Sequence, residues 1–205
     1  MSTAVQGDGI GGRAASDLSA MKRKDAFRKL CTICQRLDDR DPEHFPIIPL
    51  RLYLFGSVLT DKPDPSDMDL LFEFRDRPDL DPRDIAHRLS YGKPLPHEQA
   101  VTRLRRGMQM VRVEFLVGNL ENWLTVHCFS PDVPRELVWE PGLAWPQVVD
   151  RIESHPRPWD PAAEEQHKHL QENYRRIAEE QGTRAAQEWL EKQAQVSPTR
   201  RCAGE

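Results

Sequence analysis

Two apolar segments near the middle of the chain constrain the fold most, because both have the length and composition of buried β-strands. The first is "IIPLRLYLFGS" (47–57) and the second is "SDMDLLFEF" (66–74), and a polar, proline-broken loop joins them. In the first segment, leucines alternate with Arg51, Tyr53 and Phe55. The aromatic partners predict a strand that is covered on both faces. A short helical turn is expected at Ser57.

The second strand divides into an apolar face and an acidic face, because side chains alternate across a strand. The apolar face consists of Met68, Leu70, Phe72 and Phe74, and the opposite face of Asp67, Asp69, Leu71 and Glu73. Asp67 and Asp69 therefore point the same way, with backbones about 6–7 Å apart. Two such carboxylates repel each other, and Asp is disfavoured in strands. The pair is explained if cations bind between its members, and two Mg²⁺ ions about 3.5–4 Å apart fit this reach.

A third acid is expected from the later segment "MQMVRVEFLVG" (108–118). Its apolar face is Val111, Val113, Phe115 and Val117, and its other face is Arg112, Glu114 and Leu116. If this strand pairs beside the second one, Glu114 can lie next to Asp69. Glu73 shares the acidic face but lies about 13 Å beyond Asp69, so we interpret it as a solvated strand residue.

The Gly56-Ser57 pair follows a buried strand, where backbone N–H groups and a hydroxyl can hold phosphate oxygens. Each motif alone has a simpler interpretation: Gly-Ser is commonly a turn, and Asp-x-Asp is commonly a solvated loop or a calcium loop. "DKPDPSDMDL" lacks the glycine and the distal glutamate of an EF-hand. The combination of strand, Gly-Ser, nine residues, Asp-x-Asp, strand and a later acid is far more specific.

This combination resembles the nucleotidyltransferase superfamily of DNA polymerase β, and most closely its small, stand-alone "minimal" nucleotidyltransferases. The residues that carry the resemblance are Phe55-Gly56-Ser57, Ser66-Asp67-Met68-Asp69-Leu70-Leu71 and, more weakly, Val113-Glu114-Phe115. The resemblance covers about residues 45–120.

The resemblance implies a mixed sheet flanked by helices, two Mg²⁺ ions (Mn²⁺ being an alternative ion) and a nucleoside triphosphate, with ATP favoured. An acceptor hydroxyl attacks the α-phosphorus and pyrophosphate leaves. By position, the implied metal ligands and catalytic residues are Asp67, Asp69 and Glu114, and the implied nucleotide-binding residues are Gly56, Ser57 and Ser66. Such phosphoryl transfer depends on positioning and charge neutralisation more than on a covalent nucleophile.

Two departures from the family pattern affect these assignments. The third acid is more often Asp, although Glu occurs in aminoglycoside nucleotidyltransferases. Many minimal members carry a basic residue directly after Gly-Ser, where this chain has Val58. One phosphate contact is therefore either missing or supplied from elsewhere in the chain, with Lys62 and Arg112 as the candidates.

The function expected first is transfer of a nucleoside monophosphate to a hydroxyl of a small molecule such as an antibiotic, of a partner protein as in two-gene toxin–antitoxin systems, or of an RNA end. The alternative is an inactive binding module, or a toxin–antitoxin component, that acts by docking a partner through its C-terminal helices. Leu170, Tyr174 and Ile177 share one helical face there, although such a stripe more often packs on its own domain. A metal-dependent glycosyltransferase could use Asp-x-Asp but would not explain Gly-Ser.

Composition gives weaker constraints. The chain has 205 residues, a formal net charge of −4 and no overall basic footprint for duplex nucleic acid. An apolar signal segment and a membrane-spanning run are both absent from the sequence, so a cytoplasmic protein with no membrane partner is expected. Cys31 and Cys34 form a C-x-x-C within an apparent helix, and core thiols are favoured over zinc or redox use.

The expected class is α/β (α+β), a mixed sheet with flanking helices and a helical C-terminal extension. The expected organisation is a disordered leader (1–14), a nucleotidyltransferase domain (15–130), a Pro/Trp-rich loop with a helical C-terminal region (131–195) and a disordered tail (196–205). Helices are expected from Ser16 to about Arg40, from Asp79 or Asp81 to Tyr91, after Asn119, and over 146–154, 161–181 and 183–195. Residues 97–118 are expected to form a β-hairpin around Gly107.

Overall fold

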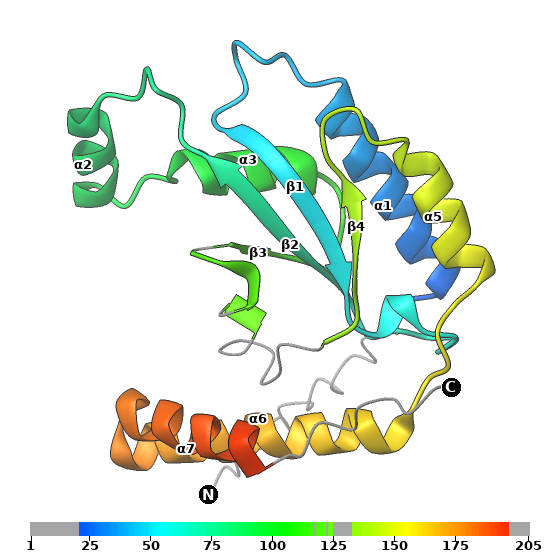
Figure 1. Ribbon diagram of the computed structural model, residues 1–205. Helices are drawn as coiled ribbons and strands as arrows, with labels where there is room; N and C mark the ends of the chain where they lie inside the picture. Colours follow the sequence, from blue (N-terminus) through cyan, green and yellow to red (C-terminus); the bar gives the residue numbers. More distant parts are fainter. Residues whose placement is uncertain (1–20, 117, 122, 125–132, 197–205) are drawn as a thin grey trace, which may run out of the picture.

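The chain folds around one four-stranded sheet with helices on its flanks (Figure 1). The computed structural model describes residues 21–116, 118–121, 123–124 and 133–196. In chain order the elements are α1 (Arg23–Asp38), β1 (Ile48–Phe55), the 3-10 helix η1 (Ser57–Leu59), β2 (Met68–Arg75), α2 (Pro82–Ser90), α3 (Pro96–Leu104), β3 (Val111–Phe115), β4 (Arg135–Trp139), α5 (Trp145–Ser154), α6 (Pro161–Gln181) and α7 (Thr183–Val196). The expected leader, the helix start at Ser16 and all of the expected tail after Val196 lie outside the described residues.

The sheet is mixed, as the sequence predicted, and its strand order is β3-β2-β1-β4. β1 runs antiparallel to both β2 and β4, whereas β2 and β3 are parallel. A parallel pair needs a crossover connection, and α2 and α3 supply it between β2 and β3. This places the three strands that carry the expected site residues next to one another.

The main core lies on one face of the sheet, which α1, α3 and α5 cover together (Figure 1). The apolar face predicted for the second strand is confirmed, because Met68, Leu70 and Phe72 are all fully buried in this core. From α1 the core receives residues at helical spacing, namely Ala26, Phe27, Leu30, Ile33, Cys34 and Leu37. The sheet is therefore anchored on the side opposite to its acidic face.

The expected hairpin over 97–118 is wrong in its first arm. Residues 96–104 form helix α3, because Pro96 suits the first helical turn and a Glu98 carboxylate oxygen accepts a hydrogen bond from the Leu95 N–H at 2.7 Å. Ala100, Val101 and Leu104 then fall on one buried helical face. The second arm is strand β3, but it pairs in parallel with β2 rather than folding back on the first arm.

Strand β4 was missed, because its five residues lie in a segment whose prolines and tryptophans are typical of a loop. Its register against β1 pairs Phe55 with Arg135 and Leu52 with Trp139. The helix expected from Ser16 to about Arg40 is shorter at its start, because Met21 and Lys22 are not helical and α1 begins at Arg23. The bounds of α2, α5, α6 and α7 agree with expectation within one or two residues. Asp81 caps α2, and Gly182, at φ +91°, separates α6 from α7. Of the helix expected after Asn119, only residues 120, 121, 123 and 124 are described, and they are helical.

The two thiols of α1 behave as core residues, as expected. Cys34 is fully buried with its sulfur 3.8 Å from the Val138 carbonyl oxygen, and Cys31 is half-buried against the same core. Burial raises the pKa of the Cys34 thiol far above its usual range, so this thiol stays protonated.

Helices α6 and α7 pack side by side below the sheet (Figure 1). Ile177 of α6 and Ala186 and Leu190 of α7 are buried, although none of them belongs to either core cluster of the sheet. Leu170 and Tyr174 are half-buried on the same stretch of α6. The apolar stripe is thus covered at least in part by the chain itself. Among the described residues, no helix is both long enough and apolar enough to cross a membrane.

The Asp38 carboxylate ties α1 to β4 and α5. Its two oxygens accept hydrogen bonds from the indole Nε1 of Trp139 at 2.7 Å and of Trp145 at 2.6 Å. Trp139 is only 1% exposed, so its N–H has little access to water when this partner is lost.

We expect Asp38→Ala to lower the free energy of unfolding by about 1–2 kcal/mol, since it removes the acceptor of a buried indole N–H. Asp38→Asn, which retains one acceptor oxygen, is expected to fall between wild type and alanine. Urea unfolding followed by tryptophan fluorescence measures both changes. Asp39→Ala, at the neighbouring position, is the control; equal losses for the two alanine variants would contradict the role given to Asp38.

Candidate functional site

The candidate site lies at the end of the sheet where β1 stops and β2 begins. In the antiparallel register of β1 and β2, Phe55 stands opposite Asp69. The next residue, Gly56, has a φ of +82°, and a Cβ at this position would lie 2.9 Å from Asp69 Oδ2. Glycine is required here both for the left-handed backbone and for the close approach of the carboxylate. The structure thus brings together two motifs that lie thirteen positions apart in the sequence.

Ser57 opens the short helix η1, as the sequence predicted. Gly56 and Ser57 are half-buried, whereas Val58 and Leu59, which follow, are buried in the core. This burial anchors the turn and leaves Ser57 at the surface end of it. It also explains the departure at Val58: a side chain that is 1% exposed packs in the core and cannot contact a phosphate.

Asp67 and Asp69 lie at the head of β2 on the acidic face, opposite the main core. Leu71, the next residue of that face, is buried in a second, smaller cluster with Phe55, Trp123 and Leu124. The Trp123 ring meets Phe55 edge-on, with ring centroids 5.9 Å apart. The acidic pair therefore borders an apolar cluster on its own face of the sheet. The aromatic residues of the first strand had predicted that this face is covered.

Glu114 is on the expected face but two residues farther along the sheet than Asp69. The parallel register of β2 and β3 places Arg112 opposite Asp69 and Glu114 opposite Leu71. Glu114 is exposed, and its negative charge still raises the pKa of Asp69. In the part of the chain that the structure describes, no three His, Cys, Asp or Glu side chains are grouped closely enough to hold a metal ion. The structure thus joins Asp67, Asp69 and Gly56, and leaves Glu114 as their diagonal neighbour.

Arg112 forms an ion pair with Asp67, with 2.9 Å between Arg112 Nε and Asp67 Oδ2. The arginine side chain is 70% exposed, whereas the aspartate side chain is only 18% exposed. Ser66 lies beside the same carboxylate, and its hydroxyl donates to Asp67 Oδ1 at 3.2 Å. A solvent-exposed guanidinium therefore neutralises one of the two aspartates.

The electrostatics of Asp69 differ from those of an ordinary surface carboxylate. Burial raises the pKa of Asp69 to about 6, and the negative charges of Asp67 and Glu114 add to the increase, while Arg112 opposes it. A cation bound between the aspartates would relieve this repulsion, and carboxylate oxygens are the ligands that Mg²⁺ and Mn²⁺ prefer. The donor set and the charge of the site therefore fit a hard divalent cation.

Lys62, the other expected phosphate contact, points instead to the C-terminal region. Its ammonium lies 2.7 Å and 2.9 Å from the two carboxylate oxygens of Glu164, in the first turn of α6. The sequence offered no signal for this contact, because the two residues are 102 positions apart.

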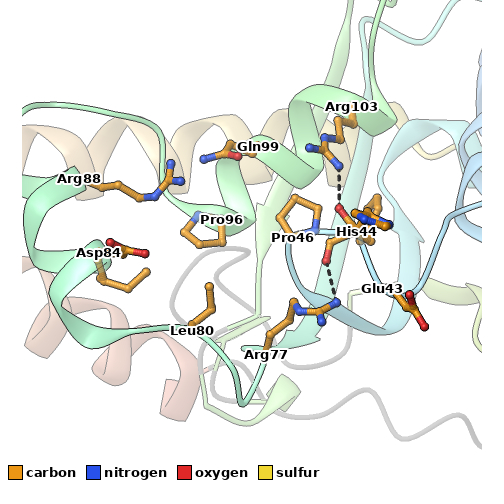
Figure 2. A pocket seen from close by; sticks show the side chains of 12 residues that line it. Glu43, His44, Pro46, Arg77, Leu80, Asp84, Arg88, Pro96, Gln99 and Arg103 are labelled. Atoms are coloured by element: carbon orange, nitrogen blue, oxygen red, sulfur yellow. Dashed lines mark hydrogen bonds between the residues drawn. The ribbon is translucent and has the colours of Figure 1, made fainter.

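A hollow of about 240 Å³ lies elsewhere, beyond the other end of β2 (Figure 2). Arg77, Arg88 and Arg103 line it, together with the acidic Glu43 and Asp84. Arg103 donates to the His44 carbonyl and Arg77 to the Phe45 carbonyl, so these arginines connect α3 and the end of β2 to the segment before β1 (Figure 2). The hollow shares no residue with the acidic pair.

Comparison with known proteins adds no relative: no family model matches this chain, and no curated protein or solved structure matches it. Any function assigned to the site depends on its motifs and geometry.

We expect Gly56→Ala to destabilise the fold by about 1–3 kcal/mol, because alanine is strained at this φ and its Cβ meets Asp69. Gly107→Ala is the matched control, since Gly107 has a similar φ of +78° with open space around its Cβ position. The difference in thermal unfolding between the two variants measures the contact with Asp69. Equal losses would contradict the close approach.

The raised pKa of Asp69 predicts a pH-dependent stability in metal-free protein. Between the unfolded value near 3.9 and the folded value of about 6, the folded state binds the proton more tightly, so the free energy of unfolding falls as pH rises. Asp69→Asn removes this dependence. It should be about 1–2 kcal/mol more stable than wild type at pH 7.5 in chelator, with no advantage at pH 4.

Denaturant unfolding across this pH range measures the effect, with the exposed Asp76→Asn as control. An advantage of Asp69→Asn that grows toward acid pH would have the wrong sign and would contradict the assignment.

Proposed function

We propose that this protein is a nucleotidyltransferase that transfers a nucleoside monophosphate, with AMP favoured, from a nucleoside triphosphate to an acceptor hydroxyl. The observation that carries the proposal is the close approach of the Asp69 carboxylate to Gly56, which leaves no room for a Cβ there, with Asp67 on the same face. This contact brings a glycine-serine turn suited to phosphate against a carboxylate pair suited to Mg²⁺.

In the proposed site, Asp67 and Asp69 hold divalent cations, two Mg²⁺ ions or Mn²⁺ in their place. When bound, the cations supply charge neutralisation for the triphosphate and activation of the acceptor. Gly56 and Ser57 bind the β- and γ-phosphates, and Ser66 completes the nucleotide-binding set beside Asp67. Glu114 is the third acid.

The reaction replaces one phosphorus–oxygen bond with another. The acceptor oxygen bonds to the α-phosphorus, the bond from that phosphorus to the β-phosphate oxygen breaks, and pyrophosphate leaves. Glu114 takes the proton of the acceptor hydroxyl. Its exposed carboxylate, diagonal to Asp69, is on the side from which an acceptor can approach.

Arg112 supports this proposal because its guanidinium already occupies the place of a cation beside Asp67, one of the two aspartates. A metal-bound triphosphate would compete with Arg112 for Asp67 and would offer the guanidinium phosphate oxygens in exchange. The acceptor is a hydroxyl of a small molecule, a partner protein or an RNA end. The free thiols of Cys31 and Cys34 fit a reducing compartment, and we place the activity in the cytoplasm.

A second candidate is a binding module that keeps the fold without catalysis, alone or as a toxin–antitoxin component. The register favours it in one respect, since Glu114 stands two residues beyond Asp69 instead of directly beside it. The test of activity must therefore measure the effect of losing Asp67 and Asp69 separately from the effect of losing Glu114.

We expect label transfer from an α-labelled nucleoside triphosphate to candidate acceptors in the presence of Mg²⁺, and its loss in the Asp67→Ala/Asp69→Ala double variant. Glu114→Gln is expected to retain the fold and to reduce turnover by about a hundredfold or more, because it removes the base. Glu73→Gln is the control: Glu73 lies on the same face farther along β2 and pairs with Arg51.

The measurement is transfer rate with each of the four nucleotides, together with binding of Mn²⁺ and nucleotide. If the double variant matches wild type in both binding and transfer, the proposed nucleotidyltransferase activity of this site is excluded. If only Glu114→Gln matches wild type, the third acid is another residue.

A further inference from the structure

The connection between α5 and α6 is bound to the loop that joins the two halves of the candidate site. Thr60 and Arg157 form a parallel β-bridge. The Asp61 N–H donates to the Arg157 carbonyl at 2.9 Å, and the Arg157 N–H donates to the Leu59 carbonyl at 3.0 Å. The Trp159 N–H donates to the Asp61 carboxylate at 2.7 Å. Residues from the C-terminal third of the chain thus extend the backbone pairing of this loop.

The start of α1 holds the same loop from its other side. Arg23 donates from Nε to the Thr60 carbonyl at 2.9 Å, and its backbone N–H donates to the Pro63 carbonyl at 3.3 Å. The Met21 N–H donates to the Pro65 carbonyl at 3.0 Å. A polar loop with little apolar surface of its own is therefore fixed by hydrogen bonds from two distant segments.

Lys62 makes the most specific contact of this loop. It is the sole lysine or arginine between Gly56 and Met68, and its ammonium contacts both oxygens of Glu164. The Trp159 indole completes the arrangement: its Nε1 donates to Glu164 at 2.9 Å, and Lys62 lies 5.2 Å from its ring centroid. The Lys62 side chain is only 17% exposed, so water screens this ion pair less than a surface pair.

The pairing of β1 with β2 fixes Asp69 opposite Phe55, but Ser57 and Asp67 lie outside the strands, at the two ends of the loop. Buried Val58 and Leu59 anchor the first end and Arg112 pairs with Asp67 at the second, so the spacing between the two ends depends on what holds the loop between them. We propose that Lys62 and Glu164 are positioning residues, whose ion pair sets Ser57 and Asp67 at the spacing that a metal-bound triphosphate requires. This inference rests on the proposed function and assigns the C-terminal helices a part in it.

The hydrogen bonds from Lys62 are the main cause that lowers the pKa of Glu164 to about 2, so the Glu164 carboxylate stays ionised throughout the physiological pH range. A lysine held in this way acts on the nucleotide through the loop, without contact with the phosphates. A charge exchange can separate these two roles.

The test uses the full chain with Glu164→Gln, Lys62→Met and the exchanged pair Lys62→Glu/Glu164→Lys. Glu165→Gln is the matched control, because Glu165 is an exposed neighbour in the same turn. Two readouts are taken: hydrogen exchange of the Asp61, Arg157 and Trp159 amides, and the Kd of a non-hydrolysable ATP analogue with Mg²⁺. Exchange of the β1 and β2 amides establishes that each variant is folded.

We expect both single variants to speed exchange at the three loop amides about tenfold and to weaken analogue binding about five- to tenfold. The exchanged pair should recover most of both losses, since it restores the ion pair but not the hydrogen bond from Trp159 to Glu164, and Glu165→Gln should change neither readout.

Two results would overturn the positioning role: analogue binding unchanged in Glu164→Gln although its loop amides exchange faster, or an exchanged pair that restores the amides without restoring binding. The latter would show that Lys62 itself contacts phosphate. A wild-type protein that does not bind the analogue would overturn the proposed function and the positioning role with it, whatever the exchange rates of the loop.

Discussion

The antiparallel register of β1 and β2 is the constraint on which the site depends. Because Phe55 stands opposite Asp69, the residue that ends the first strand meets the residue that begins the second. A shift by one residue would turn Asp69 toward the main core and would remove Gly56 from its carboxylate. Leu54 and Leu70 are buried in the core, which makes such a shift costly. The packing of the core therefore determines which side chains meet at the ends of β1 and β2.

Two like charges lie close together at this end of the sheet. Asp67 and Asp69 repel each other, and the protein compensates in two ways: Arg112 pairs with the first aspartate, and a raised pKa lets the second carry a proton near pH 6. Both forms of compensation are reversible, because an exposed guanidinium can leave and a proton can be displaced. A structural ion pair buried in the core would not be reversible in this way. The arrangement is therefore typical of a site that receives a cation.

The fold and the acidic face could be predicted from the sequence wherever local periodicity decides the structure. Alternation placed Asp67 and Asp69 together, and Gly-Ser after a buried strand predicted η1. The failures have two causes. α3 has only nine residues, and its local signals, Pro96 in the first turn and Glu98 at the cap, were not recognised. β4 and the exact register of Glu114 depend on strand pairing, which leaves no local pattern in the sequence. The contact of Lys62 with Glu164 joins residues that no periodicity relates.

Helix α6 is attached to the loop through its first turn, where Glu164 contacts Lys62. The position of this attachment determines how far a tilt of the helix would displace the loop. At 1.5 Å per residue, its 21 residues extend about 30 Å from Asp160. A tilt of about ten degrees around that end would move Gly182 by about 5 Å but Glu164 by only about 1 Å. Any such tilt of α6 would therefore displace the loop beneath its first turn far less than the far end of the helix.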